Sequence, residues 1–142
     1  MHASKGRLLI VDDDLSVRTV IARKMQSEGY ECVLVGNGKE ALAAAIAESF
    51  DLVLLDVKMP GMSGIEVLPQ IVSECPGTGV VMVTAMADTQ TAVEAMKLGA
   101  YDYITKPFNL DDLACKVQKA LERRQLILEN KELRLRAPAP KH

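Results

Sequence analysis

The sequence has little histidine, little cysteine and no long apolar run. Its two histidines, His2 and His142, lie at the ends of the 142-residue chain, where neither is placed for catalysis. Its three cysteines, Cys32, Cys75 and Cys115, are widely spaced and form no CxxC or zinc pattern, which indicates reduced thiols in a cytosolic protein. No apolar run approaches the length of a membrane span, and the first residues form no signal peptide. We therefore expect a soluble, cytoplasmic protein without a membrane partner.

An excess of charge of one sign is also lacking. Lysine and arginine total 17 and aspartate and glutamate total 19, so the net charge is −2. The basic residues after Lys116 are interleaved with Glu122, Glu129 and Glu132, which is typical of a solvated helix, so we expect no direct contact with nucleic acid. With 49% hydrophobic residues, the chain is long enough for one domain with a substantial core.

Short apolar runs alternate with longer segments of helical period, which predicts repeated βα units and a parallel sheet. Five strands are expected, at residues 8–11, 32–35, 51–56, 80–84 and 101–105. Helices are expected around residues 17–25, at 40–48, around 65–72, at 88–98, and from Asn109 onward. Right-handed crossovers place helices on both faces. The simplest result is a doubly wound α/β fold with the flavodoxin-like strand order 2-1-3-4-5.

Some elements carry finer expectations. Gly29 and Gly99 are expected to end the first and fourth helices. Pro69 is expected in the early part of the third helix, where proline costs less than in the interior. The fourth helix has a thin apolar stripe of Val93 and Met96 followed by alanines. Tyr103 is consistent with a core residue that shares one face of the fifth strand with Tyr101 and Thr105.

The last helix continues past the expected end of the domain. Strong helix formers run to Leu135 and stop at an Ala-Pro-Ala-Pro segment. We predict a phosphoacceptor domain at residues 7–123, a helical extension at 124–136 and a disordered tail at 137–142. Leucines repeat at seven residues in this helix, at positions 121, 128 and 135 and again at 126 and 133. Because the repeat is short for a coiled coil, we expect only a weak homodimer through the helix.

Residues suited to phosphoryl chemistry stand at the ends of four predicted strands. Asp12 and Asp13 follow the first strand, Asp56 ends the third, Thr84 ends the fourth and Lys106 follows the fifth. In a parallel α/β sheet the carboxyl ends of the strands share one edge, where ligands bind. Clustered carboxylates repel one another, and a hard cation such as Mg²⁺ removes that conflict. The pattern therefore predicts a Mg²⁺ ion and a phosphoryl group at this edge.

Each of these residues can be given a role. A carboxylate such as Asp56, with an ordinary pKa near ~4, is already ionised at neutral pH and can attack phosphorus without a general base. Lys106 can neutralise the charge of Asp56 or of the phosphoryl group, and Thr84 can donate its hydroxyl to a phosphoryl oxygen. Asp14 is better placed to cap the following helix. The Lys106–Pro107 bond is expected to be cis, as in a forced turn.

These motifs together resemble the receiver domain of two-component response regulators, from about Arg7 to Arg123. The resemblance is carried by the segments LIVDDD, DVKMPGMSG, VTA and KPF at residues 9–14, 56–64, 83–85 and 106–108. It implies that Asp56 is the phosphoacceptor, Asp13 a direct Mg²⁺ ligand, Asp12 a ligand through water and the Lys58 carbonyl a further ligand. It implies a switch pair of Thr84 and Tyr103, a phosphate contact from Lys106, and a partner sensor histidine kinase that carries the phosphohistidine.

One position departs from the family pattern, and the tail adds a further likeness. Ser63 stands where the family usually has aspartate; it is outside the chemistry, and serine caps a helix as well as aspartate does. The helical tail resembles the linker of NtrC-type transcription activators, which implies an output in transcription. Neither the ATPase domain nor the DNA-binding domain of those activators is present in these 142 residues.

Three alternatives remain open at this point. The Asp12–Asp14 run fits a haloacid-dehalogenase-like phosphatase with Asp12 as nucleophile, although the chain is short, has no cap domain and has no later acidic pair on the fourth strand. A nucleotide or flavin site would need a Gly-rich turn where the aspartates stand. A metal-free pseudo-receiver scaffold would not need the intact acidic set.

The resemblance implies only phosphoryl transfer by the chain itself and no separate enzymatic activity. Two side chains, Lys58 and Met86, are expected to flank the path of water to Asp56. Neither has a carboxylate or amide that would orient water, and Met86 is apolar and bulky. We therefore predict slow self-dephosphorylation, over many minutes or longer.

Overall fold

A five-stranded parallel sheet forms the centre of the molecule. The computed structural model describes residues 4–85 and 88–136. The strands are β1 (Arg7–Val11), β2 (Glu31–Val35), β3 (Leu52–Asp56), β4 (Gly79–Ala85) and β5 (Asp102–Lys106). Their order is β2-β1-β3-β4-β5 and every pair is parallel, so the predicted topology is confirmed. All five strands therefore end at the same edge of the sheet.

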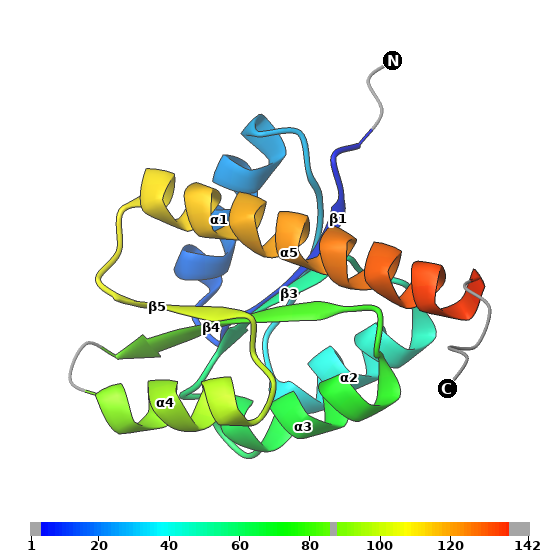
Figure 1. Ribbon diagram of the computed structural model, residues 1–142. Coiled ribbons are helices and arrows are strands. Elements are labelled where there is room, and N and C mark those ends of the chain that lie inside the picture. The colour runs from blue at the N-terminus through cyan, green and yellow to red at the C-terminus, as the bar shows by residue number, and fades with distance from the viewer. Residues whose placement is uncertain (1–3, 86–87, 137–142) are drawn as a thin grey trace.

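Helices cover both faces of the sheet (Figure 1). They are α1 (Leu15–Ser27), α2 (Gly38–Ala47), α3 (Gly64–Glu74), α4 (Thr89–Lys97) and α5 (Leu110–Arg136). Side chains of α1 and α5 pack with Leu8, Ile10 and Leu54 on one face. Side chains of α2, α3 and α4 pack with Leu9 and Val53 on the other. Consecutive strand residues thus alternate between two cores, as the two-residue period of a strand requires.

Local sequence signals set the ends of the helices. The Asp14 side chain caps α1 by accepting the Ser16 N–H at 2.9 Å, and Asn109 caps α5 by accepting the Asp111 N–H at 2.7 Å. Ser63 and Glu66 form a reciprocal capping box at the start of α3, so serine does serve there. Gly29 and Gly99 follow α1 and α4 with φ of 101° and 111°, a conformation that glycine adopts without strain. The Lys106–Pro107 peptide is cis, as expected.

The structure corrects two details of the helices. Pro69 is the sixth of the eleven residues of α3, past the first turn, and it lies on the exposed face of the helix, where water can bond to the carbonyl that its missing N–H leaves over. Helix α2 begins at Gly38, two residues earlier than expected, because Asn37 caps it by accepting the Glu40 N–H at 2.8 Å.

Two apolar assignments are also corrected. In α4 the buried residues are Ala92 and Ala95, whereas Val93 and Met96 are 52% and 38% exposed. Tyr101 precedes β5 and packs with the α1/α5 core, whereas Tyr103 packs with the core of α2, α3 and α4. Tyr101 lies before the strand, so the strand period does not place it on the face of Tyr103.

The edge strand β5 is covered by side chains from its own start and from α5. The Tyr103 N–H donates to Asp102 Oδ1 at 2.7 Å, and Lys116 Nζ lies 3.2 Å from both oxygens of Asp102. The same ammonium lies 5.7 Å from the centre of the Tyr103 ring, and the Arg123 guanidinium lies 4.8 Å from that of Tyr101. Helix α5 thereby holds both tyrosines.

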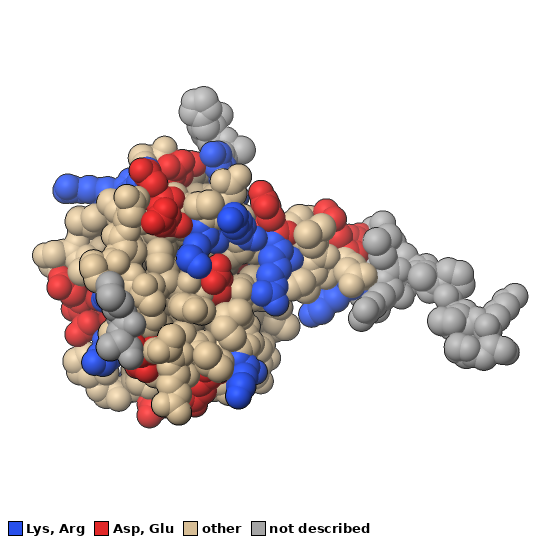
Figure 2. Space-filling view, turned by 60° about the vertical axis from the view of Figure 1, so that its left-hand side comes forward, with Lys and Arg blue, Asp and Glu red and all other residues tan. Residues whose placement is uncertain are grey.

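The end of α5 extends beyond the body of the molecule (Figure 2). Leu126 is 65% exposed, and Glu129 and Asn130 are also exposed. On the face drawn in Figure 2, acidic and basic side chains are interspersed without a broad basic area. None of the described helices is long and apolar enough to span a membrane.

Candidate functional site

The predicted acidic residues meet at the carboxyl edge of the sheet. Strand pairing sets Val11 beside Leu55 and Asp56 beside Val83, which brings the ends of β1, β3 and β4 together. Carboxylate oxygens of Asp12, Asp13 and Asp56 lie within 4.8 Å of one another. They line an open cleft of about 400 Å³, together with Lys106 and the residues Asp14, Val57, Lys58, Ala85 and Asp88.

Lys106 bridges the two buried carboxylates of this cleft. Its Nζ lies 2.9 Å from Asp12 Oδ2 and 3.5 Å from Asp56 Oδ2. Burial alone would lower the pKa of Lys106, but the hydrogen bond to Asp12 and the charge of Asp56 raise the pKa above its ordinary value. The lysine is therefore a permanent cation at neutral pH, placed to neutralise negative charge on or near Asp56.

Asp56 is buried and electrostatically disfavoured as an anion. Burial and then the charge of Asp12 raise its pKa to about 6, against the opposing effects of Lys106 and of a hydrogen bond from the Lys58 backbone. The sequence-based assumption of an ordinary pKa for Asp56 was therefore wrong, because it ignored burial and the neighbouring Asp12. Because this pKa still lies below 7, the ionised carboxylate, which is the nucleophile, predominates at neutral pH.

A divalent cation fits the chemistry of this set. Three carboxylates share one ammonium, and the resulting repulsion is part of what raises the pKa of Asp56. An oxygen-seeking cation such as Mg²⁺ removes that repulsion and binds through carboxylates and waters. Asp12 is buried with Oδ1 accepting the Asp14 N–H at 2.9 Å and Oδ2 paired with Lys106, whereas Asp13 lies at the exposed rim.

Thr84, at the end of β4 next to this cleft, has a buried hydroxyl without a hydrogen-bond partner among the described residues. The residue is 1% exposed. A buried hydroxyl without a partner is costly, and such groups in native proteins need an explanation.

The remaining predicted residues divide between the cleft and its surroundings. Lys58 lines the cleft while its side chain is exposed. Tyr103 is half-buried and is not among the residues that line the cleft; it packs on the core of α2, α3 and α4. Asp14 lines the cleft but serves α1 as its cap. Met86 lies outside the described residues.

Sequence reasoning missed Arg18. Its Nη1 donates to the carbonyl oxygen of Asp12 at 3.2 Å, so it contacts the main chain of the acidic pair. The available signal was an arginine in the first turn of the helix that follows the aspartates, where a long side chain can reach back toward the preceding loop.

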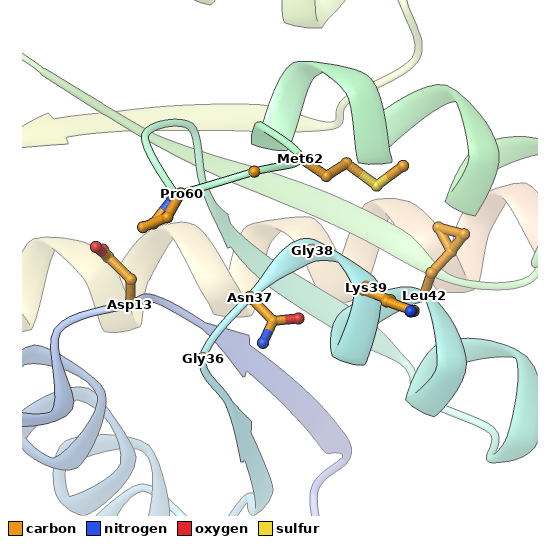
Figure 3. A pocket seen from close by; sticks show the side chains of 9 residues that line it. Asp13, Gly36, Asn37, Gly38, Lys39, Leu42, Pro60 and Met62 are labelled. Atoms are coloured by element: carbon orange, nitrogen blue, oxygen red, sulfur yellow. The ribbon is translucent and has the colours of Figure 1, made fainter.

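A larger cleft of about 770 Å³ lies beside the acidic one (Figure 3). Asp13 and Pro60 stand at one side of it, and Leu42 and Met62 at the other. Gly36, Asn37, Gly38, Lys39 and Gly61 complete its lining. The side chain of Asn37 is used as the cap of α2, so the ionisable side chains in the lining of this cleft are Asp13 and Lys39.

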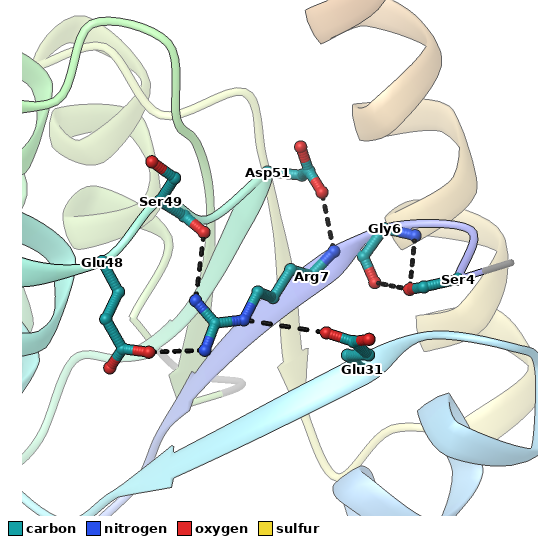
Figure 4. A network of polar contacts seen from close by, with 7 residues as sticks. All are labelled: Ser4, Gly6, Arg7, Glu31, Glu48, Ser49 and Asp51. Carbon is teal, nitrogen blue, oxygen red and sulfur yellow. Dashed lines mark hydrogen bonds and ion pairs between the residues drawn. The ribbon is translucent and has the colours of Figure 1, made fainter.

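The opposite edge of the sheet carries a separate polar network (Figure 4). Arg7 pairs with Glu31 and Glu48, donates to the Ser49 carbonyl and lies 4.7 Å from the centre of the Phe50 ring. Asp51 accepts the Arg7 N–H at 2.7 Å and pairs with Arg124 of α5 at 3.1 Å. The charges of this network are paired with one another. The network stabilises the sheet at this edge, far from the acidic cleft.

Comparison with known proteins gives a consistent picture. The family model described as "Response regulator receiver domain" matches residues 8–118. The transcriptional regulator NtrC of Salmonella typhimurium is 36% identical over 134 residues, which cover 94% of this chain and 29% of that protein. The regulatory protein AtoC of Escherichia coli is 42% identical over 129 residues, which cover 91% of this chain and 27% of that protein.

Solved structures agree with the sequence relatives. NtrX of Brucella abortus superposes with a TM-score of 0.88 at 34% identity, over 96% of this chain and 31% of that one. A CheY-like receiver domain protein of Methanospirillum hungatei superposes with a TM-score of 0.81 at 36% identity, over 87% of this chain and 98% of that one. The chain thus spans less than a third of NtrC and of AtoC, and nearly the whole length of the Methanospirillum hungatei chain.

Proposed function

The chain belongs to the response regulator receiver domain family, and we propose that it takes a phosphoryl group on Asp56 and switches conformation to control an output in transcription. The donor in this proposal is a phosphohistidine on a partner sensor histidine kinase, because this chain has histidines only at positions 2 and 142. The reaction takes place in the cytoplasm, where relatives named as transcriptional regulators would act, and this domain makes no direct contact with DNA.

The observation that carries the proposal is the environment of Asp56. A buried carboxylate lies 3.5 Å from the Lys106 ammonium and close to two further carboxylates, and the neighbouring strand β4 carries the buried Thr84 hydroxyl that has no hydrogen-bond partner among the described residues. In the proposed transfer an oxygen of Asp56 forms a bond to phosphorus while the phosphorus–nitrogen bond of the donor breaks. The nitrogen keeps that electron pair, and Asp56, already ionised, gives up no proton. Lys106 then offsets the charge of the transferred group.

The proposed metal is Mg²⁺, which when bound would neutralise charge on the phosphoryl oxygens. Asp13, Asp56 and the Lys58 carbonyl would hold it directly and Asp12 through water. The two engaged oxygens of Asp12 support this division, because Asp12 already bonds the Asp14 N–H and Lys106. Asp13 at the rim of the cleft is open to a cation entering from solvent.

The proposed switch joins Thr84 to Tyr103. A phosphoryl group on Asp56 would accept the unmet hydroxyl of Thr84 and draw it toward the site. Tyr103, one strand away on β5, would then turn inward into the space that Thr84 leaves. Its half-buried position on the α4 side of the sheet supports a change at the surface formed by α4 and β5.

Labelling with a small phosphodonor tests this function. Full-length chain incubated with acetyl phosphate and Mg²⁺ should gain one phosphoryl group at Asp56, seen as a mass increase and mapped by peptide analysis. Asp56→Asn should abolish the label, and so should EDTA. The label should decay over many minutes, because Lys58 offers no group that orients water.

The same labelling experiment also tests the phosphatase alternative, in which Asp12 is the nucleophile. Asp12→Asn should weaken labelling through the metal site without moving the label. A label found on Asp12, or one that persists in Asp56→Asn, would contradict the receiver function and favour the phosphatase. A decay within seconds would contradict only the proposed lifetime.

A further inference from the structure

Arg18 reaches from helix α1 back to the loop that carries the acidic pair. It belongs to the first turn of α1, which Asp14 caps. Its Nη1 donates to the carbonyl oxygen of Asp12 at 3.2 Å. This carbonyl belongs to the peptide that joins Asp12 to Asp13, so Arg18 contacts the short stretch of main chain between two of the three clustered carboxylates. Its Nε is buried without a hydrogen-bond partner among the described residues.

The guanidinium lies against Gly36. This glycine directly follows β2, and Asp12 is joined to that strand by a bond from its N–H to the Val35 carbonyl at 3.3 Å. A Cβ added at Gly36 would overlap Arg18 Nη1 and would lie 3.5 Å from Arg18 Cζ. Figure 3 shows Gly36 and Asp13 on neighbouring turns at the same end of the sheet. The room occupied by Arg18 therefore exists because residue 36 has no side chain.

The backbone does not require a glycine at this position. Among the described residues the glycines with left-handed φ are Gly29, Gly61 and Gly99, so Gly36 has a conformation that alanine can adopt. The atom that an added Cβ would meet is the far end of a flexible side chain and not the backbone. An alanine at position 36 would consequently displace the guanidinium of Arg18 and leave the main chain in place.

We propose that Arg18, seated against Gly36, is a positioning residue for the metal site. It fixes the carbonyl side of Asp12, while the Asp14 N–H and Lys106 fix the carboxylate side of the same residue. The Asp12–Asp13 peptide is thereby held from both sides, and the Asp13 carboxylate stays directed at the cleft. The guanidinium also brings a positive charge to a loop with three aspartates. The inference rests on the proposed function, since it concerns the Mg²⁺ site of that function.

A set of four variants of the full-length chain tests the inference. Arg18→Ala removes the guanidinium, Gly36→Ala displaces it, and the double variant does both. Arg23→Ala is the matched control, because Arg23 is an exposed arginine on the same helix. Mg²⁺ affinity is measured by calorimetry without any phosphodonor, and thermal unfolding without metal reports the stability of each variant.

Arg18→Ala and Gly36→Ala should each weaken Mg²⁺ binding by about tenfold, the lower end of the effect of residues that orient metal ligands. The double variant should be no weaker than Arg18→Ala alone, and Arg23→Ala should match the unaltered chain. The Mg²⁺ concentration for half-maximal labelling by acetyl phosphate should rise by the same factor, while labelling at saturating Mg²⁺ should recover. A general loss of structure would not recover in this way.

An Mg²⁺ affinity of Arg18→Ala within about twofold of the unaltered chain, or an equal loss in Arg23→Ala, would overturn the positioning role. The double variant tests the link between the two residues. If Gly36→Ala weakens Mg²⁺ binding by the same factor in the Arg18→Ala variant as in the unaltered chain, the link is overturned. If Gly36→Ala unfolds at a lower temperature than the unaltered chain, the Mg²⁺ affinity of Arg18→Ala alone tests the positioning role. Failure of the unaltered chain to bind Mg²⁺ or to be labelled would instead count against the proposed function.

Discussion

At the scale of the residue, Thr84 combines a structural cost with a proposed use. Its hydroxyl is buried and unmet, and an unsatisfied buried group costs about 1–3 kcal/mol. Thr84→Val removes that group with little change of shape. We expect the free energy of unfolding, measured with urea in the absence of metal, to rise by about 1 kcal/mol. The change in amide hydrogen exchange that beryllofluoride, a phosphoryl mimic, causes in the unaltered chain should be largely lost in this variant.

Thr84→Ser is the matched control, because it keeps the hydroxyl and should keep the response to beryllofluoride. A Thr84→Val variant that is less stable than the unaltered chain would mean that the hydroxyl has a partner, such as a bound water. A full response to beryllofluoride in Thr84→Val would exclude the hydroxyl from the switch.

The charged residues Asp12, Asp13, Asp56 and Lys106 of the acidic cleft could be predicted because each one directly ends or follows a predicted strand. The rule that parallel strands end at one edge then brings Asp12, Asp56 and Lys106 together without further information. Arg18 and Gly36 could not be found in this way. Their relation depends on the reach of a long side chain and on the space between segments that are distant in sequence. The raised pKa of Asp56 depends on burial, which the strand pattern does not specify.

At the scale of the element, α4 buries only small apolar side chains against the sheet. Its buried residues are Ala92 and Ala95, and these bury far less apolar surface than Val67, Leu68 and Ile71 of α3. The thin apolar stripe of Val93 and Met96 is exposed, because helical spacing alone does not say which side of a weakly apolar helix faces the sheet. Two apolar side chains that face solvent are available to an output partner.

This difference predicts where the molecule changes on phosphorylation. Amide hydrogen exchange with Mg²⁺ and beryllofluoride should change most in α4 and β5, because elements that bury little surface open at low free energy. The Asp56→Asn variant under the same conditions should show no such change. A change restricted to the loop between β3 and α3 would contradict a role for α4 in the output surface.

At the scale of the whole molecule, α5 joins the domain to its extension without a break. The helix runs from Leu110 to Arg136, and Arg124 donates to the Gly77 carbonyl at 2.6 Å and pairs with Asp51. We propose that residues 7–123 form the phosphoacceptor domain and residues 124–136 the extension. Arg124, the first residue of the extension, thus contacts the phosphoacceptor domain. The predicted tail at residues 137–142 lies outside the described residues.

The extension is the proposed site of a weak homodimer. Sedimentation of the full-length chain should give a mass that rises with concentration, whereas a chain that ends at Gln125 should remain a monomer and keep the Arg124 contacts. Leu126→Glu, which alters an exposed leucine, should have the same effect as the truncation. Equal masses for the full-length and shortened chains at high concentration would contradict a dimer through this helix.

The cover over β5 also bears on how copies of the molecule meet. An edge strand offers its outward N–H and C=O groups to any extended chain that approaches, which is the usual route to strand addition and polymerisation. In β5 the Tyr103 N–H is already bonded to Asp102, and the Lys116 ammonium lies across that carboxylate. An incoming strand would have to break this bond and strip water from an ion pair. Growth of the sheet by strand addition at β5 is therefore disfavoured.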